Sequence, residues 1–155
     1  MLLTNFIAPN SVVPLLKAKS KKQLLQDLSA RAAHITGIPE RDIFDVLLQR
    51  ERLGSTGLGH GVAIPHGKLH GLKRIAGVFA RLAEPIDFEA IDGQKVDIVV
   101  LLLAPEGAGA DHLKALARIS RLLRDGAAVE KLRAARDAAA LYAVLTEGET
   151  SSHAA

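Results

Sequence analysis

Residues 50–68 read Arg50-Glu-Arg-Leu-Gly-Ser-Thr-Gly-Leu-Gly-His-Gly-Val-Ala-Ile-Pro-His66-Gly-Lys68. They place one histidine, His66, between Pro65 and Gly67, so we expect its imidazole to sit on a rigid turn. A neutral imidazole is a nucleophile near pH 7 and can carry a covalent group. A phosphoryl group on that ring would need backbone N–H donors, hydroxyls and cations around its oxygens. The glycines, hydroxyls and basic side chains of this stretch supply all three, so the sequence predicts a phosphorylatable histidine.

Two amphipathic helices precede this stretch. The first is expected over residues 21–36, because Ser20 and Gln23 have the form of a capping box and apolar residues then recur at helical spacing until Gly37. The second begins with a proline and a glutamate and covers about residues 40–52. Both helices would bury one apolar face.

Extended and helical patterns alternate in the rest of the chain. Residues 96–103 form a continuous apolar run, which predicts a strand buried on both faces. Asp111 is the expected N-cap of the helix that follows this strand. The other expected elements are a glycine loop at 54–61, an extended piece at 62–65, a strand at 75–82, a turn-rich connection at 85–93 and helices at 111–124, 127–135 and 137–146. This order predicts an α/β fold with a mixed β-sheet flanked by helices.

Length and composition indicate a single domain over residues 1–146, followed by a small polar tail at 147–155 that we expect to be disordered. Hydrophobic residues make up 48% of the chain but aromatic ones only 3%, so the core is expected to be aliphatic. The longest apolar stretch, residues 98–104, is far shorter than a membrane span. The absence of cysteine excludes disulfides and thiolate metal sites, and it suits a cytoplasmic protein.

The basic residues do not indicate a nucleic-acid partner. Their excess is small, because 20 Lys and Arg face 17 Asp and Glu, which gives a formal net charge of +3. The two signs are interspersed along the chain, whereas nucleic-acid binding favours clustered basic residues. We therefore expect a solvated surface whose modest positive charge would steer an acidic protein partner.

Neither a nucleotide cofactor nor a metal ion is expected. A dinucleotide fingerprint needs a strand before its glycines and a helix after them, and the expected order here is the reverse. The pair His66 and His70 has the spacing of a zinc site on a helix, which His60 or His112 could complete. The proline and glycine that flank His66 argue against a helix there, so this spacing does not bring the two rings together.

His112 is a second candidate site residue. It lies in the first turn of the helix expected over 111–124, and the apolar residues Leu116, Ile119 and Leu123 follow it on the same face. His112 therefore points inward, toward the sheet. A buried histidine at a helix N-terminus is either a satisfied core residue or half of a site, and the spacing leaves both readings open.

The Gly-Ser-Thr-Gly and Ala-Ile-Pro-His-Gly-Lys segments, with a second histidine 46 positions after the first, resemble the fructose/mannitol-type enzyme IIA family of the bacterial phosphotransferase system. The similarity covers about residues 3–146 and is closest to the nitrogen-related branch. It implies a three-layer α/β domain with a mixed sheet. It also implies a histidine that is phosphorylated on Nε2 by a phosphocarrier protein of the HPr or NPr type.

Matched residue by residue, the resemblance implies that His66 accepts the phosphoryl group, that His112 supports it by a hydrogen bond, and that Arg50 stabilises the transferring group. The expected phosphoryl-binding residues are Ser55, Thr56, Gly67 and Lys68. His60 departs from the family pattern, in which mannitol-specific relatives have glutamate and nitrogen-related ones often asparagine. Its contribution to the site is therefore an open point.

The sequence favours a phosphoryl carrier that regulates partner proteins through the phosphorylation state of His66. A regulatory role is expected because no membrane domain or IIB-like cysteine segment is fused to the domain. One alternative is a fructose- or mannitol-specific transport IIA that passes phosphate to a separate IIB component. An alternative of another class is a binding module that has kept the fold but lost phosphotransfer.

Overall fold

One mixed sheet of six strands forms the middle layer of the computed structural model, which describes residues 1–149. The strands are β1 (Val12–Leu16), β2 (Gly57–Gly59), β3 (Val62–Ala63), β4 (His66–Leu69), β5 (Ala76–Ile86) and β6 (Val96–Pro105). The helices are α1 (Lys21–Thr36), α2 (Glu40–Arg52), α3 (Ala110–Leu123), α4 (Gly126–Ala134) and α5 (Ala138–Leu145), and two 3-10 turns, η1 (Leu3–Asn5) and η2 (Pro9–Ser11), precede β1.

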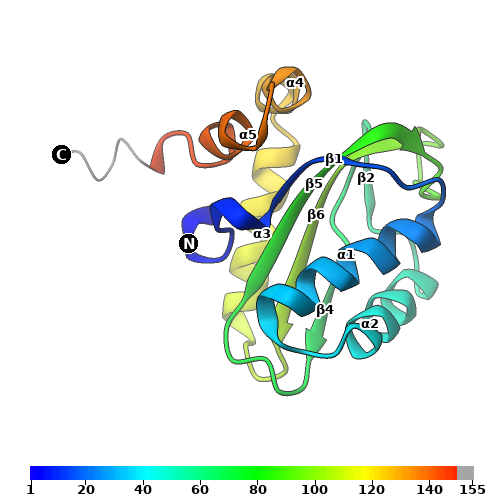
Figure 1. The fold of residues 1–155 in the computed structure, drawn as a ribbon, viewed down its shortest axis with the longest axis vertical. Coiled ribbons are helices and arrows are strands. Elements are labelled where there is room, and N and C mark those ends of the chain that lie inside the picture. Colours follow the sequence, from blue (N-terminus) through cyan, green and yellow to red (C-terminus); the bar gives the residue numbers. More distant parts are fainter. Residues whose placement is uncertain (150–155) are drawn as a thin grey trace.

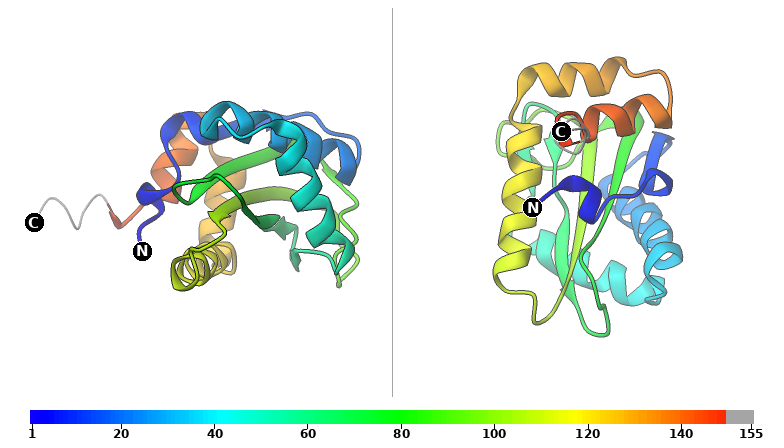
Figure 2. Two further views of the ribbon diagram at one scale, coloured as in Figure 1. Left: turned by 90° about the horizontal axis from the view of Figure 1, so that it is seen from below. Right: turned by 90° about the vertical axis from the view of Figure 1, so that its left-hand side faces the viewer.

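The strands follow the order β1-β5-β6-β3-β2, and β4 also pairs with β6. The pairs that β6 forms with β3 and β4 are parallel, whereas its pair with β5 is antiparallel. Helices α1 and α2 cover one face of the sheet, and α3, α4 and α5 lie on the other (Figure 1, Figure 2). The predicted three-layer α/β domain with a mixed sheet is confirmed.

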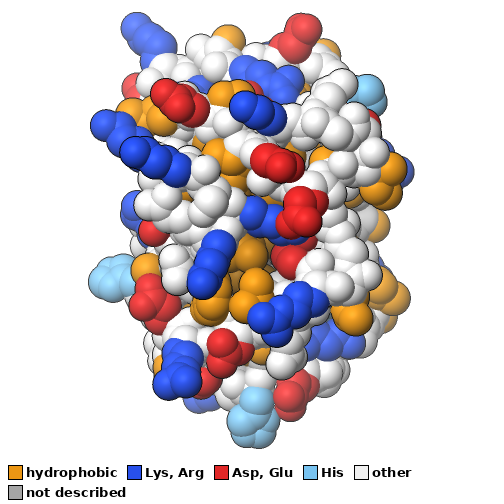
Figure 3. Space-filling model, turned by 90° about the vertical axis from the view of Figure 1, so that its right-hand side faces the viewer, with side chains coloured by type: hydrophobic (Ala, Val, Ile, Leu, Met, Phe, Trp, Pro, Cys, Tyr) orange, Lys and Arg blue, Asp and Glu red, His pale blue; other side chains and the backbone are white. Residues whose placement is uncertain are grey.

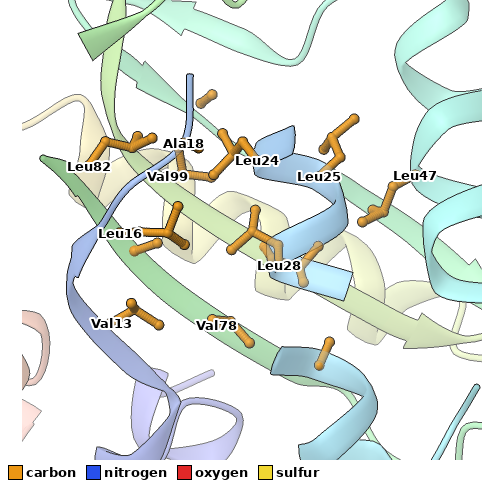
Figure 4. Close-up of a cluster of buried hydrophobic side chains, with 14 of the residues drawn as sticks. Val13, Leu16, Ala18, Leu24, Leu25, Leu28, Leu47, Val78, Leu82 and Val99 are labelled. Atoms are coloured by element: carbon orange, nitrogen blue, oxygen red, sulfur yellow. The ribbon is translucent and has the colours of Figure 1, made fainter. Parts of the chain in front are cut away.

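Two hydrophobic clusters hold the layers together. Alternate residues of β6 enter opposite clusters, because successive side chains of a strand point to opposite faces. Leu101 packs with α1 and α2, whereas Leu102 packs with the helices of the other face. Figure 4 shows the first cluster, in which Leu24 and Leu28 of α1 point toward the sheet beside Val99. Strand β6 is thus buried on both faces, as its apolar run predicts.

Local sequence signals set the bounds of α1. The Ser20 hydroxyl accepts a hydrogen bond from the N–H of Gln23 at 3.1 Å, and the Gln23 side chain accepts one from the N–H of Lys19 at 2.8 Å. At the other end Gly37 takes a left-handed conformation, with φ of 78°, and ends the helix. The predicted helix over residues 21–36 is confirmed, and α2 likewise agrees with its predicted range.

Strands β3 and β4 are two parts of one extended segment that runs along β6. Val62 pairs with Ile98 and His66 with Leu102, so both strands keep the same register. The ladder is interrupted at Pro65, which has no N–H to donate, although its carbonyl still accepts from the N–H of Leu102 at 3.0 Å. The prediction that His66 lies on a turn was therefore wrong, because this residue begins β4.

Two other predictions need correction, and one strand was not predicted. Helix α3 begins at Ala110 with Gly109 at the N-cap position, so Asp111 is a first-turn residue and not the cap. Strand β5 continues to Ile86, into the region expected to be a connection. Strand β1 has no counterpart in the prediction, because it is a short edge strand that contains Pro14 and its sequence shows little alternation.

The described chain continues past the domain end expected at residue 146. Glu149 is buried, and its carboxylate accepts hydrogen bonds from the N–H groups of Leu3 and Thr4 at 2.8 and 3.1 Å. Arg118 of α3 pairs with the same carboxylate at 2.8 Å. Residues 147–149 thus belong to the folded domain, and the rest of the expected tail, residues 150–155, lies outside the described residues. Within residues 1–149, no helix has the length and apolar character needed to cross a membrane.

Candidate functional site

Two open hollows meet at His66. The first has a volume of about 600 Å³ and the second of about 260 Å³, and both His66 and Arg50 line each of them. The first is also lined by Val46, Gln49, Arg52, Leu53, Gly67, Lys68 and His112. The second is also lined by Ser55, Thr56, Gly57, Leu58, Ile64, Leu116 and Ser120. The structure thus brings together all seven residues that the sequence assigned to the site, from α2, the glycine loop, β4 and α3.

The carbonyl of Ile64 determines which nitrogen of the half-buried His66 ring is free to react. Nδ1 of His66 lies 2.8 Å from this carbonyl oxygen. A carbonyl oxygen can only accept a hydrogen bond, so Nδ1 carries the proton of the neutral ring and Nε2 carries the lone pair. Nε2 is therefore the nucleophilic nitrogen.

The surroundings of His66 favour the neutral form of its ring. Burial lowers the pKa of His66, because the charged imidazolium loses hydration. The hydrogen bond to Ile64 raises this pKa, the Arg50 guanidinium lowers it and the Glu51 carboxylate raises it, and the net result is a pKa below the ordinary histidine value. A neutral ring with an available lone pair is the form that can accept a phosphoryl group.

His112 faces His66 across the first hollow. The two ring centroids lie 5.8 Å apart with the planes tilted by 47°. His112 is buried, as predicted, and burial lowers its pKa, with further lowering by His66 and Lys68. Among the described residues, Nδ1 of His112 is a buried nitrogen without a hydrogen-bond partner. The site therefore holds two adjacent imidazoles, and both favour the neutral form.

Arg50 lies in the last turn of α2, where basic residues complement the helix dipole. One guanidinium nitrogen, Nη1, donates to the carbonyl of Gly54 at 2.9 Å. This contact holds the side chain against the glycine loop at the hollows that contain His66. A planar guanidinium has five N–H donors, so one bond to a carbonyl leaves capacity to bind an anion.

The hydroxyls of Ser55 and Thr56 hold the loop together. Ser55 Oγ donates to the carbonyl of Phe88 at 2.9 Å and accepts from the N–H of Gly57 at 3.1 Å. Thr56 Oγ1 donates to the carboxylate of Glu51. A hydroxyl has only one hydrogen to donate. In this arrangement neither hydroxyl has a hydrogen left for a phosphoryl oxygen, although both residues line the second hollow.

Gly67 and Lys68 contribute to the site in different ways. A Cβ atom added at Gly67 would lie 2.4 Å from Cγ1 of Val46, so only glycine lets α2 approach β4 this closely. Lys68 is exposed and lines the first hollow, where its ammonium group would add positive charge near a bound anion.

His60 is not among the residues that line the two hollows. It is exposed at the β2–β3 turn with φ of 56°, and its N–H donates to Asp92 at 2.9 Å. Its carbonyl accepts from Arg133 at 3.0 Å. His60 therefore shapes the hairpin and lines neither hollow. Among residues 1–149, no group of three or more His, Asp or Glu side chains could hold a metal ion.

Sequence reasoning missed one buried charged residue beside the site, Glu51. Its carboxylate accepts from the N–H of Thr56 at 3.1 Å and pairs with the Lys21 ammonium at 3.0 Å. A signal was present, because Ile43, Leu47 and Glu51 recur every four residues and the first two are fully buried. Helical spacing thus places Glu51 on the inner face of α2.

Comparison with known proteins supports one family. The sequence model for the phosphoenolpyruvate-dependent sugar phosphotransferase system, EIIA 2, matches residues 5–148. A nitrogen regulatory protein of Bradyrhizobium diazoefficiens is 65% identical over 145 residues, which cover 94% of this chain and 95% of that protein.

Solved structures agree with this assignment. The nitrogen regulatory protein IIA-Ntr of Neisseria meningitidis superposes with a TM-score of 0.86 at 36% identity, covering 90% of this chain and 95% of that one. The mannitol IIA of Escherichia coli shares the fold alone, with a TM-score of 0.75 at 18% identity and coverage of 90% and 98%. The chain therefore belongs to the EIIA 2 family of the phosphoenolpyruvate-dependent sugar phosphotransferase system, and it is a phosphotransfer component of that system.

Proposed function

We propose that the protein accepts a phosphoryl group on Nε2 of His66 from an HPr- or NPr-like phosphocarrier protein. In this step the P–N bond of the donor phosphohistidine breaks as a P–N bond to Nε2 forms, and the proton on Nδ1 stays in place. The observation that supports this most directly is the 2.8 Å contact between Nδ1 and the Ile64 carbonyl, which leaves Nε2 as the free nucleophile.

Two cationic side chains and a second imidazole would assist the transfer. The transferring phosphoryl group carries negative charge on its three equatorial oxygens, so transfer depends on positioning and charge stabilisation. Arg50 is a cation that lines both hollows, and Lys68 adds an exposed charge at the first. His112 would donate a hydrogen bond to a phosphoryl oxygen. Ser55 and Thr56 would act by holding the loop.

The site is better suited to a protein donor than to a small metabolite. Both hollows are open, and two large apolar side chains that line them are exposed, namely Leu53 in the first and Leu58 in the second, with 86% and 36% of their surface accessible. Exposed apolar side chains around a reactive group are typical of a protein contact surface. On the face over α2, basic and acidic side chains are interspersed with apolar ones (Figure 3), so this face lacks the continuous basic patch that nucleic-acid binding favours.

The regulatory role is proposed from the relatives. The proteins from Bradyrhizobium diazoefficiens and Neisseria meningitidis are both named nitrogen regulatory proteins, and both match nearly the full length of this chain. We propose that this protein likewise regulates partner proteins according to the phosphorylation state of His66. The alternative, a fructose- or mannitol-specific transport role, would require transfer to a IIB component.

Mass spectrometry of the protein after incubation with phosphoenolpyruvate, enzyme I and an HPr-like carrier tests the proposal, under neutral or alkaline conditions that preserve phosphohistidine. Wild type should gain a single phosphoryl group, and His66→Ala should gain none while keeping its circular dichroism spectrum. Labelling of another residue in His66→Ala would contradict the assignment. No labelling of wild type by an active donor would instead favour the binding module. Adding a purified mannitol or fructose IIB then separates a transport role from a regulatory one.

A further inference from the structure

Glu51 is a buried carboxylate that the proposed phosphoryl transfer does not use. Only 4% of its side chain is exposed, and Lys21 of α1 is its counter-ion at 3.0 Å. The Lys21 ammonium also lies 4.5 Å from the centroid of the Phe88 ring and 3.6 Å from the exposed Glu89. A buried ion pair is often no more stabilising than packed apolar residues, because both charges lose hydration. Its presence beside the site therefore suggests a role other than stability.

Both oxygens of the Glu51 carboxylate hold Thr56. The N–H of Thr56 donates to Oε1 at 3.1 Å, and the Thr56 hydroxyl donates to Oε2. The backbone carbonyl of Glu51 also accepts from the N–H of Gly54 at 3.1 Å. These contacts fix the loop that joins α2 to β2.

Two chains of hydrogen bonds lead from this loop to the reacting groups. The carbonyl of Thr56 accepts from the N–H of Ile64 at 3.1 Å, and the carbonyl of Ile64 in turn accepts from Nδ1 of His66 at 2.8 Å. In the second chain, the carbonyl of Gly54 accepts from the Arg50 guanidinium at 2.9 Å. The nucleophile and the cation are thus both attached to the loop that Glu51 holds.

We infer that Glu51 is a positioning residue that, with Lys21 as its counter-ion, orients both His66 and Arg50 through the loop at Thr56. This inference rests on the proposed function, in which the orientation of His66 and Arg50 serves phosphoryl transfer. Glu51 neither gives nor takes a proton in the transfer, and the bonds that break and form are those at phosphorus. A displacement of about 1 Å at a reacting group can cost about 100-fold in rate, so loss of this contact should slow the transfer measurably.

The first test compares Glu51→Gln with wild type. We expect the rate of phosphorylation by the HPr-like carrier to fall by about 10- to 100-fold. The same loss is expected with phosphoramidate, a small phosphoryl donor, because the defect lies in the site and not in docking of the carrier. Glu89→Gln is the matched control, since it removes the exposed partner of Lys21 and leaves Thr56 untouched; its rate should equal that of wild type. A wild-type rate in Glu51→Gln would overturn the inference.

A second variant separates positioning from stability. Glu51→Gln removes the buried partner of the Lys21 ammonium and leaves it the exposed Glu89, so the melting temperature of this variant should fall. The double variant Lys21→Met with Glu51→Gln removes that charge and keeps the apolar contact with Phe88, so it should recover the melting temperature. Its transfer rate should remain low if Glu51 positions the site. Recovery of both properties together would show that Glu51 acts only on stability.

A measurement without phosphoryl transfer keeps this test independent of the proposed function. In ¹⁵N NMR spectra, the signal of the protonated Nδ1 of His66 should be sharp in wild type. In Glu51→Gln this signal should be exchange-broadened or mixed with that of the other tautomer. An unchanged spectrum in this variant would contradict the inference. If wild type were not phosphorylated on His66, the proposed function would fail, and this spectrum would still decide whether Glu51 orients the ring.

Discussion

Nδ1 of His66 donates a hydrogen bond to the carbonyl oxygen of Ile64 at 2.8 Å. Because this contact places the proton of the neutral ring on Nδ1, phosphorylation is expected at Nε2 only. Two-dimensional ¹H–¹⁵N NMR of the phosphorylated protein distinguishes the two isomers by the nitrogen that couples to phosphorus. Coupling to Nδ1 would show that the ring has turned away from Ile64 and would contradict this prediction.

The lowered pKa of His66 predicts that the protein can accept phosphate in mildly acidic solution. Burial and the Arg50 guanidinium lower this pKa, so the midpoint of an NMR titration of His66 should lie below the ordinary value of about 6.5. Below that midpoint the ring is protonated and has no lone pair, so the rate of phosphorylation by phosphoramidate should fall in the same range. Arg50→Ala should raise the midpoint because it removes a nearby positive charge. A midpoint at or above 6.5 in wild type would contradict the prediction.

Arg50→Ala should slow phosphoryl transfer without unfolding the domain. The guanidinium lies at both hollows, and removal of one group that stabilises charge in a transition state typically costs about 100- to 1,000-fold in rate, or about 3 to 4 kcal/mol. Single-turnover transfer from the phosphorylated carrier measures this loss. Arg41→Ala, an exposed arginine in the first turn of the same helix, is the control and should transfer at the wild-type rate. Equal rates in the two variants would mean that Arg50 only ends the helix.

Much of the fold could be predicted because its signals are local. The apolar periodicity and the caps of α1 depend on neighbouring residues, and so does the continuous apolar run of β6. Strand β1 is different, since its pairing with β5 depends on residues more than 60 positions away, such as Phe79 opposite Val12. The closing contact of Glu149 with Leu3 is equally non-local. No pattern within either segment could have predicted these contacts.

For the site, the sequence likewise predicted which residues take part better than it predicted the contacts that they make. The sequence predicted that His112 points inward, and the structure places its ring 5.8 Å from that of His66. It did not predict that the hydroxyls of Ser55 and Thr56 donate to the Phe88 carbonyl and the Glu51 carboxylate, because a hydroxyl near a glycine loop can donate equally well to a ligand or to an acceptor of the protein. The tautomer of His66 likewise depends on a carbonyl whose direction only the backbone path determines.

Gly67→Ala should destabilise the domain by about 1 to 3 kcal/mol, a typical cost of overpacking. The added Cβ would lie 2.4 Å from Cγ1 and 3.8 Å from Cβ of Val46. Urea unfolding measures the loss. The double variant Gly67→Ala with Val46→Ala removes the clashing methyl group and should regain part of the stability relative to Gly67→Ala alone. If the losses of the single variants Gly67→Ala and Val46→Ala simply added in the double variant, the close approach of α2 and β4 would not explain the glycine.

The carboxylate of Glu149 should make the stability of the domain depend on pH at acidic values. Burial raises the pKa of Glu149, but hydrogen bonds from Leu3 and Thr4 and the Arg118 guanidinium outweigh burial, so the pKa lies below its ordinary value. A depressed pKa in the folded state contributes stability above the unfolded-state pKa of about 4.3, and this contribution is lost as the pH falls through the folded-state pKa. Glu149→Gln should therefore lower the free energy of unfolding at pH 7 by about 3 kcal/mol, a typical loss when one partner of a buried ion pair is removed. The difference in unfolding free energy between the variant and wild type should narrow as the pH falls below about 4.3, as measured by urea unfolding at each pH.

The control is Glu147→Gln, which removes an exposed carboxylate paired with Lys131 at 3.4 Å. This variant should change the unfolding free energy by less than about 1 kcal/mol at pH 7 and at pH 3. A constant gap between Glu149→Gln and wild type from pH 7 to pH 3 would mean that the charge of Glu149 does not hold the two ends of the chain together.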